Sequence, residues 1–430
     1  MDRIKVAYIC HFSTPSIRES LSLKSLWLSN VLRKLKGISR LDYGDSATWN
    51  ADFITTFENN DEYDCYVISH HFGMKKSEQC FDKNGVHYMF INEQQDGLFY
   101  KIRKNIIKRY KINRFVGDGK RIGRIVEDIN PDVVVVCGAE NALYSSSVLY
   151  IHHKPIFIIL QTLANSPKRK EMGMGNDEWR AFERKVLLKA QYFGTFNKDE
   201  ADYLEELKGQ AFSLKILFPS LPPIFEGKVE KDCDFVFFAN GLFKYKGIED
   251  ALKGFAQVCK KYCRATMVVI GACDDAYKKV LDELVEKEGI KDKVTFMKHF
   301  PFKSDVIKQV QKAKVAVLPG ITAPLNSTVR ETMYLGVPTV VYETSITKVI
   351  NQKQMCLLEA EMENAEDLGN KMIYAYEHPM EMAEMAKRAK EYAEEHFSSK
   401  AVAKMLDNNV KAVVNHFYNN KQIPEELLLK

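Results

Sequence analysis

Short apolar runs alternate with amphipathic stretches along the first half of the chain. Five of these runs are continuous and rich in β-branched residues, at positions 4–12, 65–70, 86–91, 132–137 and 155–160. Continuous rather than alternating hydrophobicity is typical of strands that are covered on both faces. Because helical stretches separate most of the runs, the pattern predicts a parallel, doubly wound α/β sheet.

The second half repeats this scheme. Its apolar runs lie at 234–240, 266–271, 293–297, 314–319 and 338–342, and helices such as 247–262 and 276–289 have apolar positions three and four apart. A Pro- and Gly-containing stretch at 218–233 has the composition of a linker. We therefore predict an N-terminal domain at 1–218, a C-terminal domain at 219–397, and a helix within 398–430 that packs back on the first domain.

Length and composition limit the alternatives. A chain of 430 residues is too long for one ordinary core, and a formal net charge of +5 is too small to argue for a nucleic-acid partner. No apolar run approaches the roughly 20 residues of a membrane span, and the N-terminus does not resemble a secretory signal. The nine cysteines include no CxxC pair, and no metal site is expected. These features favour a cytoplasmic protein.

Two segments of the second domain have residues suited to an anionic ligand. Lys244 and Lys246 precede Gly247 at an expected helix start, where an ammonium and backbone N–H groups act together. Asn326, Ser327 and Thr328 stand at a second helix start, and Glu331 follows Thr328 by three. Each segment also has a purely structural explanation. Lys244 and Lys246 could be solvated loop lysines, and Thr328 with Glu331 could form a capping box.

A third segment and one stretch of the first domain complete the candidates. Phe300, with His299, follows the strand predicted at 293–297, where their backbone could meet a base. Glu140 and Asn141 follow the strand that ends near Cys137. Glu140 could orient an acceptor hydroxyl or take its proton, although a helix-terminal Glu and cap explain the pair equally well. A buried inert thiol is the simpler reading of Cys137.

A basic stretch runs from Lys101 to Arg124. It contains ten Lys or Arg, and no Asp or Glu occurs from 97 to 117. Interleaved aromatic and aliphatic residues make it suited to an anionic membrane surface. A solvated helix face is an equal alternative, and no RNA-binding motif accompanies the charges.

The order "FANGLFKYKGIEDALKGFAQV", "MVVIG", "VTFMKHF", "AKVAVLPGITAPLNSTVRETMYLGVPTVVY" and "HFSS" resembles the GT-B glycosyltransferases, in particular the large retaining class called family 4. The resemblance covers about 234–397 well and the first half more weakly. It implies two Rossmann-like domains facing across a cleft. It also implies transfer of a hexose, with retention, from a nucleotide sugar to a saccharide or lipid-linked saccharide. Neither a metal nor a cofactor beyond that co-substrate is implied, and an enzyme acting on lipid-linked acceptors would work at the inner membrane face.

The resemblance also implies roles for individual residues. Lys246-Gly247 matches the Lys-Gly of the loop that binds the donor diphosphate, with Lys244 as a further charge. The segment from Asn326 to Thr328 matches backbone that meets the diphosphate. Glu331 matches the second Glu of a Glu-x7-Glu motif, which holds the donor ribose. Phe300 lies where the family contacts the base.

The chain departs from the family at several positions. Ala323 stands where the first Glu of the motif is expected, and Gly241 stands where an Arg is expected. Cys137 closes the segment in which the family often has His-x-His, and Ser13 and Thr14 replace its early Gly-Gly loop. Two alternatives therefore stay open: a nucleotide-sugar 2-epimerase of the same fold, and a catalytically impaired nucleotide-binding scaffold.

Overall fold

The computed structural model describes positions 3–35, 40–92, 116–219, 229–297, 300, 303–321 and 325–429. The chain divides into two compact units. The first comprises Met1–Phe218 together with Val402–Lys430, and the second comprises Pro219–Ala401. Each unit is built on its own sheet with its own hydrophobic core.

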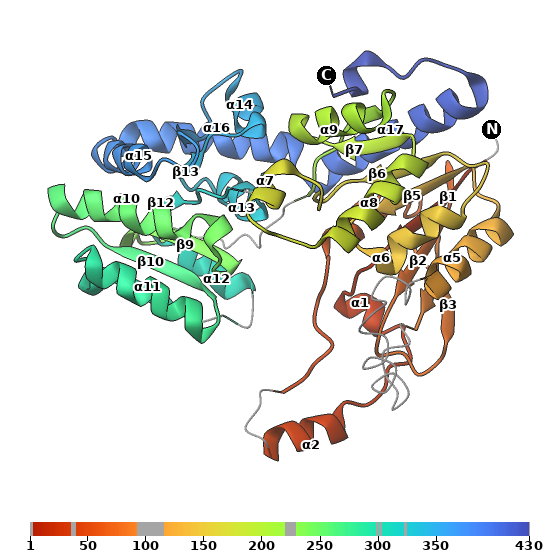
Figure 1. The fold of residues 1–430 in the computed structure, drawn as a ribbon, viewed down its shortest axis with the longest axis horizontal. Coiled ribbons are helices and arrows are strands. Elements are labelled where there is room, and N and C mark those ends of the chain that lie inside the picture. Colours follow the sequence, from red (N-terminus) through yellow and green to blue (C-terminus); the bar gives the residue numbers. More distant parts are fainter. Residues whose placement is uncertain are drawn as a thin grey trace. The chain divides into compact units, whose positions relative to one another are not determined.

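The first unit contains an eight-stranded sheet in the order β3-β4-β2-β1-β5-β6-β7-β8 (Figure 1). Its strands are β1 Ile4–Cys10, β2 Tyr63–His70, β3 Glu78–Lys83, β4 Val86–Ile91, β5 Val133–Cys137, β6 Ile156–Ile159, β7 Tyr192–Thr195 and β8 Phe212–Lys215. All pairings are parallel except that of β3 with β4. All five residues of β5 are buried, as the continuous apolar run predicts for a central strand.

The antiparallel edge strand β3 was not predicted. Its residues alternate between exposed and half-buried, because only one face of this edge strand is covered. Asn84 and Gly85 join β3 to β4 with φ values of 51° and 76°. An Asn-Gly pair with two positive φ angles is the sequence signal of a tight two-residue hairpin, and it is present in the sequence.

Helices of the first unit are α1 Pro15–Arg18, α2 Trp27–Leu35, α3 Trp49–Ile54, α5 Val116–Ile129, α6 Ala142–Ser145, α7 Pro167–Glu171, α8 Asp177–Lys189 and α9 Lys198–Lys208, with 3-10 turns η3 Ser146–Tyr150 and η6 Glu425–Leu427. Helix α17, Ser399–Asn419, returns from the far end of the chain to this unit. Three of its apolar residues, Val402, Leu406 and Val410, are fully buried.

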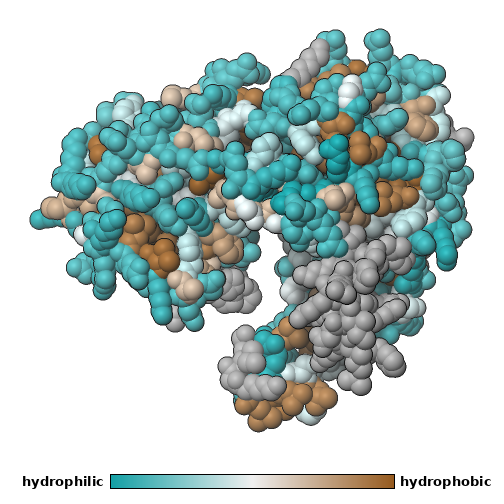
Figure 2. All heavy atoms as spheres, viewed as in Figure 1, coloured by the Kyte–Doolittle hydropathy of each residue, from teal (hydrophilic) through white to brown (hydrophobic). Residues whose placement is uncertain are grey.

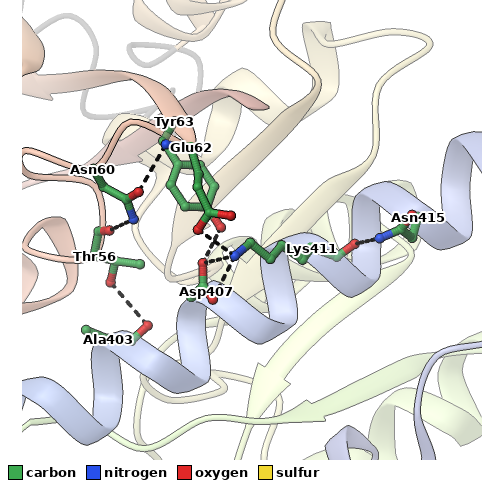
Figure 3. Close-up of polar contacts among 8 residues, drawn as sticks. All are labelled: Thr56, Asn60, Glu62, Tyr63, Ala403, Asp407, Lys411 and Asn415. Carbon is green, nitrogen blue, oxygen red and sulfur yellow. Dashed lines mark hydrogen bonds and ion pairs between the residues drawn. The ribbon is translucent and has the colours of Figure 1, made fainter. Parts of the chain in front are cut away.

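Polar contacts hold α17 against β2 and the loop before it (Figure 3). The Tyr63 hydroxyl donates to Asp407 at 2.6 Å, and the Lys411 ammonium pairs with both Asp407 and Glu62. Burial and the Asp407 carboxylate raise the pKa of Tyr63 well above its ordinary value. The residues after α17 continue along the sheet edge, where the Leu429 N–H donates to the carbonyl of Ser213 in β8.

The second unit contains a six-stranded, wholly parallel sheet in the order β11-β10-β9-β12-β13-β14. Its strands are β9 Cys233–Gly241, β10 Met267–Ala272, β11 Val294–Met297, β12 Ala313–Val317, β13 Thr339–Tyr342 and β14 Leu358–Ala360. The chain moves outward from β9 through β10 and β11, and then crosses back to β12. Strand order therefore reverses between β9 and β12, which is the switch point where open α/β sheets bind ligands.

Helices of the second unit are α10 Ile248–Lys261, α11 Asp275–Lys287, α12 Lys303–Gln311, α13 Ser327–Leu335, α14 Ser345–Asn351, α15 Ala365–Glu377 and α16 Pro379–His396, with 3-10 turns η4 Lys244–Lys246 and η5 Lys291–Lys293. Their apolar stripes cover the sheet, as Phe255 of α10 does where it packs edge-on against Phe235 of β9. Among the helices of the described residues, none is both long enough and apolar enough to cross a membrane.

Candidate functional site

The candidate site of the second unit lies at the carboxyl ends of β9 and β12. A small hollow of about 90 Å³ is lined by Phe237, Phe238, Ala239, Asn240, Lys246, Leu318, Asn326, Ser327 and Thr328. These residues come from the end of β9, the turn η4, the end of β12 and the start of α13. The hollow therefore occupies the switch point of the sheet, with a lysine and a helix N-terminus at its wall.

Gly247 fixes the position of Lys246. It caps α10 with a φ of 78°, a left-handed conformation that glycine adopts without a steric penalty. A Cβ at this position would also overlap the carbonyl group of Pro319. The turn and the loop after β12 are joined further by the Ile321 N–H, which donates to the Tyr245 carbonyl at 3.0 Å. Close backbone contact thus holds Lys246 at the end of β12.

Lys246 reaches the start of α13. Its ammonium donates to Asn326 Oδ1 at 3.3 Å and lies 5.5 Å from the centre of the Tyr245 ring. The first amides of a helix have no acceptor within the helix, so the start of α13 offers N–H donors beside the ammonium. A cation and backbone donors together form a site suited to an anion.

The predicted capping box of Thr328 and Glu331 is wrong. Helix α13 begins at Ser327, so its N-cap is Asn326, and that side chain makes no capping hydrogen bond. Thr328 already lies in the first turn and cannot cap Glu331's amide. The Asn326 side chain instead accepts from the Lys246 ammonium, so it does not cap the helix.

Glu331 does not line the hollow. Its side chain is only 6% exposed, and its carboxylate accepts from the ammonium of Lys303 at 2.7 Å. The neighbouring Arg330 donates to the Leu325 carbonyl at 2.8 Å, and burial lowers the pKa of its guanidinium to about 10. Sequence reasoning missed both cations, because neither stands in a motif with Glu331.

The remaining donor-side candidates lie around this centre. Lys244 is exposed in η4, next to Lys246. Phe300 is half-buried beyond the end of β11 and is not part of the hollow. His299 and Ala323 lie outside the described residues. A wider groove of about 660 Å³ lies between α15 and α16, beside the start of β14 and away from the carboxyl ends of β9 and β12. We assign the ligand site to the smaller hollow for that reason.

On the acceptor side, Ser13 and Thr14 have structural partners. Ser13 bridges to Ser46 through two backbone hydrogen bonds, and its hydroxyl accepts from Arg18 at 2.9 Å. Thr14 precedes α1 and its hydroxyl lies 3.3 Å from that of Ser16. The Cys137 thiol is fully buried and donates to the Tyr8 hydroxyl, and burial raises its pKa well above the ordinary value. A thiol held protonated in this way is a weak nucleophile.

Glu140 has an unusual environment in the first unit. Gly138, with a φ of 105°, turns the chain after β5, and the Glu140 carboxylate lies over it beside the Tyr144 hydroxyl. Its Oε2 atom is buried, and within the described residues it has no hydrogen-bond partner. Burial raises the pKa of this carboxyl to about 8, helped by the nearby charge of Glu183. Asn141, by contrast, caps α6 by accepting from the Leu143 N–H.

Two further buried carboxyls follow neighbouring strands. Glu200 accepts from the Thr195 hydroxyl at the end of β7, and burial raises its pKa to about 7. Glu183 of α8 accepts from the N–H groups of Ala164 and Asn165, and burial raises its pKa also. Unlike Glu140, both are satisfied by hydrogen bonds, which supports a structural role for them.

Most of the predicted basic stretch, 101–115, lies outside the described residues. Its described part belongs to α5, where Arg121 pairs with Glu78 at 3.1 Å and donates to the Ser77 carbonyl. Within the described residues, no group of three His, Cys, Asp or Glu side chains is placed to hold a metal ion.

Comparison with known proteins agrees with the geometry of the second unit. Positions 224–396 match the family model described as glycosyl transferases group 1. No curated protein is similar enough in sequence to be matched.

Solved structures similar to this chain cover nearly its whole length. Sucrose-phosphate synthase from Thermosynechococcus elongatus is 13% identical with a TM-score of 0.66, over 95% of this chain and 98% of that one. Anabaena Alr3699/HepE, solved with UDP and glucose, is 12% identical with a TM-score of 0.62, over 95% and 100%. A glycosyltransferase from Rickettsia africae ESF-5 is 12% identical with a TM-score of 0.60, over 98% and 100%.

The chain thus has the GT-B fold, with two parallel-sheet units. Together, the family-model match in the second unit and the structural likenesses support a GT-B glycosyltransferase.

Proposed function

We propose that this protein is a retaining glycosyltransferase that moves a hexose from a nucleotide sugar to a saccharide or lipid-linked saccharide, without a metal ion. The observation that supports it most is the hollow at the β9–β12 switch point, where Lys246 and the start of α13 meet. Structures of similar fold were solved with UDP and with UDP-glucose, which favours the same ligand class here. Cytoplasmic action on a lipid-linked acceptor at the inner membrane face belongs to this proposal.

The donor diphosphate would bind to Lys246 and to the first amides of α13. The negative charge on the diphosphate grows as the sugar leaves, so a fixed ammonium and fixed N–H dipoles lower the energy of the transition state. The backbone contact between Gly247 and Pro319 keeps these groups in position before the ligand arrives. Glu331 would reach the donor ribose, in which case the Lys303 ammonium orients its carboxylate.

On the acceptor side, Glu140 is the proposed acid–base group. A pKa of about 8 lies close to a neutral working pH, where a carboxyl exchanges its proton most usefully. Its Oε2 atom is buried and has no hydrogen-bond partner within the described residues, so it would bond to an acceptor hydroxyl that displaced the groups covering it. The basic stretch from Lys101 to Arg124 would hold the enzyme near anionic lipid.

The test is a panel of UDP-, GDP-, ADP- and TDP-sugars, with and without a crude lipid acceptor. Nucleoside diphosphate release and sugar isomerisation are followed together. Release that the acceptor stimulates is expected. A new sugar isomer without release would instead identify an epimerase, and binding without turnover would identify a scaffold.

Two variants locate the donor site. Lys246→Ala should weaken nucleoside diphosphate binding at least tenfold, whereas the matched variant Lys279→Ala, an exposed lysine of α11, should not. If Lys246→Ala bound nucleoside diphosphate as tightly as the unchanged protein, the hollow would not be the donor site, even if the enzyme transferred sugar.

A further inference from the structure

Helix α2 exposes an apolar face that no other part of the described chain covers. None of its nine residues is buried. Its large apolar residues are Trp27, Leu28, Val31, Leu32 and Leu35, with exposed fractions of 71%, 62%, 37%, 53% and 79%. Figure 2 shows them as a hydrophobic patch over α2, which stands apart from the layers of the first unit in Figure 1.

The two faces of α2 are cleanly separated. At 100° per residue the five apolar side chains fall within an arc of about 140°, and Ser29, Asn30, Arg33 and Lys34 occupy the rest. The polar side is tied to the chain itself, because Asn30 donates to the Leu41 carbonyl at 2.9 Å and accepts from the Leu41 N–H at 2.7 Å. The apolar side of α2 therefore faces away from this contact with Leu41.

The segment that contains the helix is predominantly basic, with Asp42 just beyond it paired with Arg40 at 3.4 Å. From position 20 to position 41 the chain has five Lys or Arg and no Asp or Glu. Two of these, Arg33 and Lys34, lie in the last turn of α2 itself. A short helix with a strong apolar face, a tryptophan and a basic polar face is suited to the interface of an anionic bilayer.

The small size of α2 argues against a membrane-spanning role and against a stable protein interface on its apolar face. Nine residues span about 14 Å, less than half of a bilayer's hydrocarbon core, so the helix can lie in the interface but not cross it. Its footprint, about 14 Å by 10 Å, is far below the roughly 800 Å² per partner of a stable protein interface. Insertion into headgroups needs no such area, because affinity grows with each apolar side chain and each basic charge.

We propose that α2 docks the first unit on an anionic lipid surface. The helix lies in the plane of the headgroups, with Trp27, Leu32 and Leu35 inserted and Arg33 and Lys34 against phosphate. This inference does not depend on the proposed glycosyl transfer, because lipid binding is measured without donor or acceptor. It also differs from the predicted contact through Lys101–Arg124, which involves another segment.

Cosedimentation with vesicles tests the proposal. The full chain should bind vesicles of phosphatidylcholine with phosphatidylglycerol, and bind phosphatidylcholine alone much less. Arg33→Gln with Lys34→Gln should lower the affinity about 25-fold, because each basic residue near the surface contributes about 1 kcal/mol, or about fivefold. Leu32→Ser with Leu35→Ser should lower it at least tenfold. The matched variant Leu188→Ser, an exposed leucine of α8, should bind as the unchanged protein does.

Because no α2 residue is buried, these variants should unfold at the unchanged temperature. Equal binding of both vesicle types, or unchanged binding by both α2 variants, would overturn the proposal. So would loss of binding only when Lys101, Arg103 and Lys104 are changed to Gln. A dimer of the unchanged protein that Leu32→Ser with Leu35→Ser dissociates would assign α2 to a second copy of this chain, and would also overturn it.

Discussion

Gly247→Ala should damage both the stability of the second unit and its nucleotide binding. Two costs add at this position. An L-residue with a φ near 78° loses about 1–2 kcal/mol relative to glycine. The new methyl group also overlaps the Pro319 carbonyl, so the loop after β12 must move, and such overpacking costs about 1–3 kcal/mol more.

Gly289→Ala is the matched control in the same unit. Gly289 has a φ of 69°, but a Cβ there meets nothing within 4 Å. It therefore measures the conformational cost alone. At roughly 2–4 °C per kcal/mol for a unit of this size, we expect the melting temperature to fall by about 2–8 °C in Gly289→Ala and about twice as far in Gly247→Ala.

Calorimetry gives the melting temperatures, and titration with UDP, GDP and ADP gives the affinities. For whichever nucleotide binds, Gly247→Ala should lower the affinity at least tenfold, because the shifted loop carries Asn326 away from Lys246. Gly289→Ala should bind as the unchanged protein does. Equal effects of the two substitutions on both quantities would refute the view that close backbone contact organises the site.

Three further predictions concern other side chains. Glu331→Gln should weaken UDP binding about tenfold but leave inorganic pyrophosphate binding unchanged, whereas Lys246→Ala should weaken both; equal effects of Glu331→Gln on the two ligands would contradict a ribose contact. The Glu140 carboxyl, with a pKa of about 8 against an ordinary 4.5, keeps a proton that the unfolded chain loses, so stability falls as pH rises across this range, by at most about 1.4 kcal/mol per pH unit. Glu140→Gln should flatten that slope in urea unfolding from pH 5 to 9, and an unchanged slope would show that the carboxyl ionises freely. Asp407→Ala should lower the free energy of unfolding by about 1–3 kcal/mol, because it leaves the Tyr63 hydroxyl without its acceptor. This loss should be smaller in a protein that also has Tyr63→Phe, and additive losses would mean that the hydrogen bond contributes little.

The strands at the centre of each sheet could be predicted from the sequence, because residues buried on both faces form continuous apolar runs. Val133–Cys137 is such a strand. The edge strand Glu78–Lys83 has polar residues on its open face, so its run is broken, and only the Asn84-Gly85 turn marks it. The fold class follows from the central strands and is confirmed by the solved structures of the same fold.

The candidate site was predictable only in part. Lys246 and the segment from Asn326 to Thr328 come together because both follow strands of one parallel sheet at its switch point, and this is a property of topology that the sequence order reveals. Glu331 and Lys303 are 28 positions apart in the sequence and lie on different helices, so their pairing depends on how α12 and α13 pack in the folded unit. The reading of Thr328 and Glu331 as a capping box placed the N-cap two residues too late, because the helix begins at Ser327 and its N-cap is Asn326.

The return of α17 to the first unit has a consequence for biosynthesis. Met1–Phe218 leaves the ribosome before α17 has been made, so the surface against which Val402, Leu406 and Val410 pack stays uncovered until all of Pro219–Ala401 has been made. The second unit is continuous in sequence and can close first. The usual N-to-C order of domain maturation is then reversed, and the half-finished first unit is the species that needs protection from aggregation during translation.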